Sequence, residues 1–145
     1  MKTHTKKKNS FVSSSQWGAL SLAGMLVMCG CSQAMPDRAE RMPRSYVYYL
    51  DGAGGGGLIS NWAGGVRKGM LDAGYNGAGE IFAWNTGMGV YADQTASVEY
   101  KRGKAAELAR EIVEYQRTYP QAPVTLIGLS AGTAVAAFVL EALPP

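Results

Sequence analysis

The segment Pro123-Val-Thr-Leu-Ile-Gly-Leu-Ser-Ala-Gly132 decides the expected fold, because it joins a strand pattern directly to the start of a helix. Residues 123–127 are apolar and partly β-branched, which predicts a buried strand. Residues 131–143 are apolar nearly all round, which predicts a helix buried on several sides. Gly128 and Gly132 flank Ser130 symmetrically, so we expect a sharp turn between strand and helix.

Strand and helix patterns also alternate along the chain before this segment. Residues 46–50 and 80–84 are short apolar runs with aromatic residues, which predicts two more strands. Apolar residues recur every three or four positions after Ser60 or Asn61 and again over 98–119, which predicts two helices, with a polar loop through Asp93 between them. The order β-α-β-α-β-α predicts an α/β fold, a three-layer αβα sandwich around a mostly parallel sheet.

Ser130 stands where a nucleophile would be expected. A serine hydroxyl attacks well when it is exposed, is deprotonated by a nearby base and lies close to donors that stabilise an oxyanion. A tight strand-to-helix turn lifts the side chain off the sheet, and Gly128 and Gly132 remove side chains that would clash there. The pattern therefore predicts a nucleophilic Ser130. The alternative interpretation is a serine that only caps the following helix.

From Ser45 onward the chain resembles the α/β-hydrolase fold family of serine hydrolases, which includes esterases and lipases. The resemblance implies that Ser130 is the nucleophile on an elbow shaped by Gly128 and Gly132. It also implies that the backbone N–H of Ala131 is one oxyanion donor. The implied reaction is hydrolysis of an ester, thioester or amide in a small-molecule or lipid substrate, with no cofactor and no metal.

The second oxyanion donor in this family comes from a loop that follows an earlier strand, where lipases and esterases often carry His-Gly-Gly-Gly. At that place this chain has Asp51-Gly-Ala-Gly-Gly55. The glycine content matches the family, whereas Asp51 replaces the histidine. The resemblance therefore implies a donor at Ala53 or at its neighbours Gly52 and Gly54.

Two other interpretations of the glycine run stay open. Gly52-x-Gly54-x-x-Gly57 satisfies the dinucleotide-binding fingerprint between a predicted strand and a predicted helix. Against a Rossmann-like domain, Asp51 would lie near the phosphates, and the next strand ends in Trp84-Asn85 without an acid for the ribose. A purely structural turn is the other alternative.

The partners of Ser130 in a catalytic triad are not evident in these residues. The family order is serine, then acid, then histidine. Only Glu141 follows Ser130 as an acid, and the single histidine is His4. We therefore expect residues 45–145 to be a partial domain, truncated after the elbow helix and inactive by itself. The alternative function is that of a non-catalytic envelope lipoprotein. We expect Asp72 and Asp93, which precede Ser130, to be solvated surface groups.

The first 30 residues predict an export signal of the lipoprotein type. A basic start is followed by a 12-residue apolar run, 17–28, which is shorter than the about 20 residues of a membrane-spanning helix. Cys31 after Gly30 resembles a lipobox and predicts lipidation, hence a membrane anchor at the cell envelope. Cleavage after Ser32-Gln-Ala34, giving a secreted protein, is the alternative. Residues 31–44 are expected to be a tether.

Charge and cysteine content exclude other classes of function. The net charge of +3 comes from the leader, since from Cys31 onward 10 basic residues face 11 acidic ones. Nucleic-acid binding therefore has no support from composition. The two cysteines lie at 29 and 31, so neither a disulfide nor a cysteine metal site is expected in the folded domain.

Overall fold

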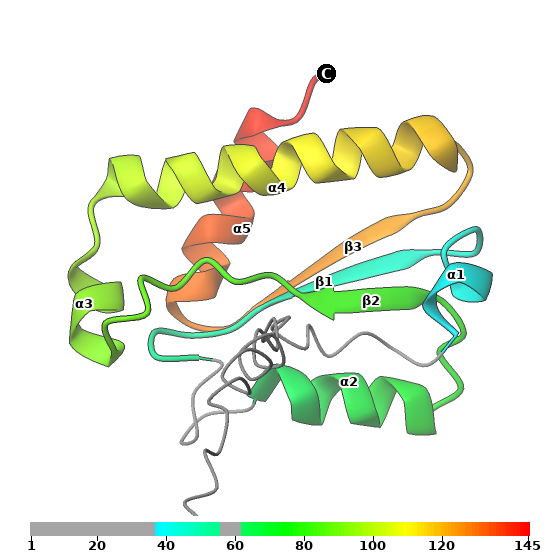
Figure 1. Ribbon diagram of the computed structural model, residues 1–145, viewed down its shortest axis with the longest axis horizontal. Helices are drawn as coiled ribbons and strands as arrows, with labels where there is room; N and C mark the ends of the chain where they lie inside the picture. The colour runs from blue at the N-terminus through cyan, green and yellow to red at the C-terminus, as the bar shows by residue number, and fades with distance from the viewer. Residues whose placement is uncertain (1–36, 56–61) are drawn as a thin grey trace, which may run out of the picture. The chain divides into compact units, whose positions relative to one another are not determined.

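The computed structural model describes residues 37–55 and 62–145, in which helices and strands alternate (Figure 1). This arrangement confirms the expected α/β class. The elements, in chain order, are α1 (Arg38–Arg41), β1 (Tyr46–Leu50), α2 (Trp62–Asp72), β2 (Ala78–Ile81), α3 (Val90–Thr95), α4 (Val98–Thr118), β3 (Val124–Gly128) and α5 (Ala131–Ala142).

The three strands form one parallel sheet in the order β2-β1-β3. Tyr46 lies opposite Ala78 on one side and Val124 on the other, and Leu50 lies opposite Gly128. All five residues of β1 are buried, as is usual for a central strand with helices on both faces. The strand expected at residues 46–50 is confirmed.

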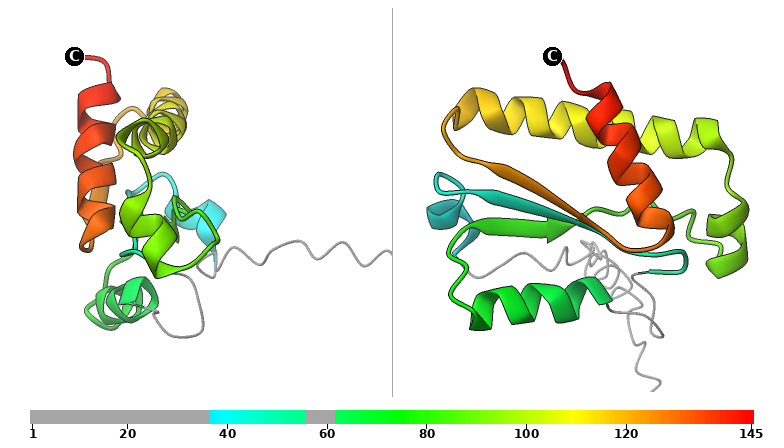
Figure 2. Two further views of the ribbon diagram at one scale, coloured as in Figure 1. Left: turned by 90° about the vertical axis from the view of Figure 1, so that its left-hand side faces the viewer. Right: turned by 180° about the vertical axis from the view of Figure 1, so that it is seen from behind.

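The side chains of β1 alternate between two separate apolar clusters. Tyr46, Tyr48 and Leu50 pack with residues of α4 and α5, whereas Val47 and Tyr49 pack with α2. Figure 2 shows α4 and α5 on one side of the sheet and α2 on the other. The alternation follows from the period of two in a strand. Because helices cover both faces of the sheet, the carboxyl ends of β1 and β3 lie between them.

The longest helix, α4, begins and ends close to its expected bounds. The Ser97 hydroxyl accepts a 3.1 Å hydrogen bond from the Tyr100 N–H and caps its first turn. Its buried stripe consists of Ala105, Leu108, Ala109, Ile112 and Tyr115. The helical periodicity of the sequence therefore predicted both the element and most of its buried face.

Two stretches between α2 and α4 differ from expectation. The second strand covers Ala78–Ile81 and not residues 80–84, and Trp84 lies beyond its end with a fully buried side chain. The polar stretch expected to be a loop contains α3, a helix of six residues. So short a helix gives too few repeats for an apolar period to show in the sequence.

Residues 37–44 were expected to belong to a tether, but they contain α1 and contact the domain. Arg38 forms a 3.0 Å ion pair with Glu80 of β2. The Tyr115 hydroxyl donates a 2.6 Å hydrogen bond to the carbonyl oxygen of Met42. The folded part of the chain therefore starts several residues before Ser45.

The expectation that α5 is buried on several sides is wrong. Only Gly132, Val135 and Val139 of this helix are buried, and Leu140 is 66% exposed. The helix packs through one stripe against α4 and the sheet. Among residues 37–55 and 62–145, β3 pairs only with β1, so its outer edge has no partner strand there.

Candidate functional site

Ser130 lies at the carboxyl end of β3, directly before α5, and is exposed to solvent. The Leu129 N–H donates a 3.0 Å hydrogen bond to the Leu50 carbonyl and extends the pairing of β1 with β3 up to this turn. Within the described residues, the Ser130 hydroxyl has no hydrogen-bond partner. The predicted strand-turn-helix context is therefore present, with the hydroxyl at its tip.

The backbone of Ser130 is held in a conformation that favours glycine. Its φ of 49° and ψ of −120° match the first central position of a type II′ turn, where glycine dominates. A non-glycine residue there costs of the order of 1–3 kcal/mol, and such strain gathers at functional sites. The strained backbone therefore marks Ser130 as a candidate functional residue.

The interpretation of Ser130 as a capping residue is wrong. Its side chain makes no capping hydrogen bond, although it stands at the N-cap position of α5. Ser97 at the start of α4 shows the contrast, because it has an ordinary extended backbone and accepts from Tyr100. The Ser130 hydroxyl is thus free to take part in chemistry.

The two flanking glycines are required by close backbone contacts. A Cβ atom at Gly128 would lie 2.9 Å from Thr133 Cα, in the first turn of α5. A Cβ atom at Gly132 would overlap the carbonyl oxygens of Leu50 and Asp51 at the end of β1. Gly128 therefore lets the strand pass close to the first turn of α5, and Gly132 lets that helix approach the end of β1.

The glycine loop, residues 51–55 after β1, lies directly beside Ser130. A Cβ atom at Gly52 would lie 3.6 Å from the Ser130 Cβ. The helices that follow β1 and β3 pack on opposite faces of the sheet, so the two loops meet at a switch in topology. In open α/β sheets, ligands bind at such a crevice.

Most backbone N–H groups of the glycine loop already have acceptors. The Gly52 N–H donates to Asp51 Oδ1 at 3.1 Å, and the Gly54 N–H donates to Asp93 Oδ2 at 2.7 Å. The Gly55 N–H donates to the Gly52 carbonyl at 2.9 Å. Of the three residues expected to supply a second donor, only Ala53 has an N–H that lacks an acceptor among the described residues.

The N–H of Ala131 also lacks an acceptor among the described residues. It occupies the first position of α5, where a helix has no acceptor of its own for the N–H group. The following N–H groups, those of Gly132 and Thr133, bond to the carbonyls of Leu129 and Ser130. Ala131 therefore offers a donor beside the Ser130 hydroxyl, at the positive end of a helix.

Asp93 is buried at the base of the glycine loop, so the expectation of a solvated surface group is wrong. Its carboxylate accepts from the Gly54 N–H, from Asn85 Nδ2 at 2.9 Å, and from the N–H and hydroxyl of Thr86 at 2.7 and 2.6 Å. Burial by itself raises the pKa of Asp93, but these hydrogen bonds outweigh it and lower the pKa to about 2. The group is a fixed anion.

Asp51 is also buried, at 1% exposure. One carboxylate oxygen accepts from the Gly52 N–H, and the other has no partner among the described residues. Together with Asp93 it puts two carboxyl groups at this loop. Such a loop is a poor receptor for the phosphates of a dinucleotide, and Gly57 of that fingerprint lies outside the described residues.

Residues 37–55 and 62–145 contain no histidine that could act as the base for Ser130. His4 lies outside the described residues, as do Cys31 and the remainder of the leader. Glu141 forms a 2.8 Å ion pair with Arg102 on α4. Asp72 pairs with Lys68 on the surface of α2, as expected of a solvated group.

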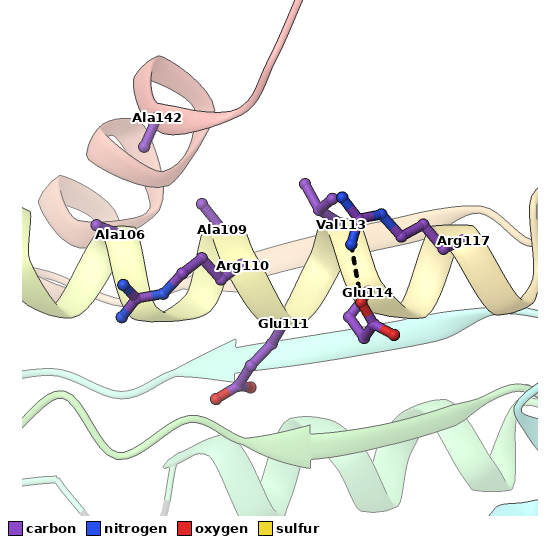
Figure 3. Close-up of a pocket in the computed structure, with 8 residues that line it drawn as sticks. All are labelled: Ala106, Ala109, Arg110, Glu111, Val113, Glu114, Arg117 and Ala142. Atoms are coloured by element: carbon purple, nitrogen blue, oxygen red, sulfur yellow. Dashed lines mark hydrogen bonds and ion pairs between the residues drawn. The ribbon is translucent and has the colours of Figure 1, made fainter.

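A hollow of about 710 Å³ lies along α4, with Ala142 of α5 also in its lining (Figure 3). Its lining combines charged side chains of α4 with small ones, and Glu114 and Arg117, one turn apart on that helix, pair at 3.2 Å. None of its residues belongs to the loops after β1 or β3. The hollow is therefore separate from the Ser130 turn.

Neither a metal centre nor a membrane span is found in the part of the chain that the structure describes. No group of three or more metal-ligating side chains occurs among those residues. No helix among them is long and apolar enough to cross a bilayer. No family model matches the chain, and no curated protein or solved structure matches it.

Proposed function

We propose that Ser130 is the nucleophile of a serine hydrolase of the α/β-hydrolase type, acting on an ester, thioester or amide. The observation that carries the proposal is the strained backbone of an exposed, uncapped serine between two sterically required glycines. The sheet order and the helices on both faces agree with a three-layer sandwich of that type.

In the proposed reaction the Ser130 oxygen forms a bond to the carbonyl carbon of the substrate. The negative charge on the carbonyl oxygen is stabilised by the N–H groups of Ala131 and Ala53, each worth about 3–4 kcal/mol in the transition state. The serine proton passes to a base and then to the departing alcohol, thiol or amine. Water releases the acyl group from Ser130.

The base in this proposal is a histidine that the described residues do not contain. The chain therefore supplies the nucleophile and the oxyanion donors, while the position of histidine and acid rests on the family order alone. The absence of histidine from the described residues also favours a second candidate, a non-catalytic envelope module that keeps the turn without the reaction. The two differ in whether Ser130 reacts.

Exposed apolar side chains beside the glycine loop support an apolar acyl or alcohol group in the substrate. Met88 and Tyr91 are about four-fifths exposed, and Val90 packs against Gly54. A small-molecule or lipid ester fits such surroundings. We further propose that acylation of Cys31 anchors the protein at the cell envelope, with release by cleavage after Ala34 as the alternative.

Labelling with a fluorophosphonate probe tests the enzyme proposal. The protein should be purified in the form that the native cells make. It should acquire one covalent adduct, and peptide mapping should place that adduct on Ser130. Ser130→Ala should abolish labelling. Ser97→Ala is the matched control, because Ser97 also precedes a helix but only caps it. Failure of the unmodified protein to label would support the non-catalytic module.

A further inference from the structure

Asn85 connects Asp93 to the glycine loop. Its side-chain nitrogen donates to Asp93 Oδ2 at 2.9 Å and to the carbonyl oxygen of Gly52 at 3.2 Å. Both partners are acceptors, which fixes the orientation of the amide. Asp93 in turn is held by Thr86 and by the Gly54 N–H, so one buried carboxylate joins the segment after β2 to the segment after β1.

The Gly52 carbonyl and the Ala53 N–H belong to one peptide unit. That unit is planar and trans, so its oxygen and its N–H point in opposite directions. Two donors hold the oxygen, Asn85 at 3.2 Å and the Gly55 N–H at 2.9 Å. Fixing the oxygen therefore fixes the direction of the Ala53 N–H.

We infer that Asp93 and Asn85 are positioning residues of the proposed hydrolase, which orient the Ala53 N–H toward the oxyanion. The inference rests on the proposed function. Neither side chain touches the substrate: Asp93 orients the amide of Asn85, and the amide holds the Gly52–Ala53 peptide unit. Asp93 also fixes the far side of the loop through Gly54, whose φ of 75° gives the loop its turn.

The variants Asp93→Asn and Asn85→Asp test this support with almost no change in shape. In Asp93→Asn, an amide NH2 replaces a carboxylate oxygen that accepts hydrogen bonds, so two donors face each other. In Asn85→Asp, a second carboxylate lies beside that of Asp93. Each should lower kcat for an ester substrate by on the order of tenfold to a hundredfold, with a smaller effect on KM. Asp72→Asn and Asn76→Asp, at exposed positions, are the matched controls and should leave kcat unchanged.

A second readout separates orientation of the donor from general damage. An oxyanion site built from N–H groups stabilises oxygen better than sulfur, so an intact site should prefer an ester over the corresponding thionoester. That preference should fall in both variants. Thr86→Val removes one hydrogen bond to Asp93 and keeps the side-chain shape, so it should show a milder loss, and Thr86→Ser should restore activity.

The outcomes separate the two levels of inference. If the unmodified protein does not react with the fluorophosphonate, the proposed function is wrong and the positioning role falls with it. If it reacts, but folded Asp93→Asn and Asn85→Asp proteins keep normal kcat and normal ester preference, the positioning role alone is wrong. If both of these variants fail to fold, an unchanged preference in Thr86→Val overturns it.

Discussion

The indole Nε1–H of Trp84 donates a 2.7 Å hydrogen bond to the backbone carbonyl of Asp51, at the end of the central strand. Both residues are fully buried. The bond ties the segment after β2 to the start of the glycine loop, 33 residues earlier in the chain. Trp84 therefore holds the Asp51 carbonyl, and Asn85 holds the next carbonyl along the same loop, that of Gly52.

Trp84→Phe should lower the free energy of unfolding by about 2–4 kcal/mol, since it leaves a buried carbonyl without a donor and removes ring volume from the core. Urea unfolding followed by circular dichroism measures the change. Trp62→Phe, at a half-buried position in α2, should cost less and serves as the control. Equal losses for the two variants would contradict the role given to the indole N–H.

Gly132→Ala should destabilise the protein by several kcal/mol, of the order found for overpacking at a rigid site. The added methyl group would overlap backbone oxygens at the end of β1, which cannot move without breaking the pairing of β1 with β3. Gly103→Ala is the matched control within α4. There a Cβ meets nothing within 4 Å, so alanine should stabilise by about 0.5–1 kcal/mol. Thermal melting tests both predictions, since the melting temperature should fall in Gly132→Ala and rise in Gly103→Ala.

Replacement of Ser130 should separate backbone strain from chemistry. Ser130→Gly should raise the free energy of unfolding by about 1 kcal/mol, because relief of the positive φ exceeds the added entropy of the unfolded chain. Ser130→Ala keeps the strain and should leave stability near that of the unmodified protein. Parallel urea titrations test this order, and a glycine variant less stable than the alanine variant would argue against strain at this position.

The pKa of Asp93 makes stability sensitive to acid. Its folded value of about 2 lies below the ordinary value of 3.8, so the folded state disfavours the proton. This group therefore contributes about 2 kcal/mol at pH values above 4, and the contribution is lost as the pH falls toward 2. Unfolding free energies measured across that range should drop more in the unmodified protein than in Asp93→Asn. Parallel curves for the two proteins would exclude Asp93 as the cause.

Local sequence patterns predicted the central strand and the longest helix. The run Tyr46–Leu50 and the stripe of α4 carry their own periodicity, and both elements lie where the sequence placed them. The turn at Ser130 could also be predicted, because glycines two residues before and two residues after the serine are typical of a sharp strand-to-helix turn. The serine's strain, by contrast, became visible only in its backbone angles.

The supports of the glycine loop could not be read from the sequence. Asp93 and Asn85 lie in a stretch without strand or helix periodicity, and their partners at Gly52 and Gly54 are more than 30 residues away. The choice of Ala53 as donor depends on which neighbouring N–H groups are already bonded. That is a property of tertiary contacts, to which spacing along the chain gives no access.

The position of β1 in the middle of the sheet has a consequence for the order of events during synthesis. The central strand is the first of the three to be made, whereas the second of its two neighbours, β3, is complete only when residue 128 has been added. Until then a strand rich in aromatic and aliphatic side chains has an unpaired edge, which invites association with other nascent chains. The late pairing is also long-range in sequence, so we expect slow folding that benefits from chaperones.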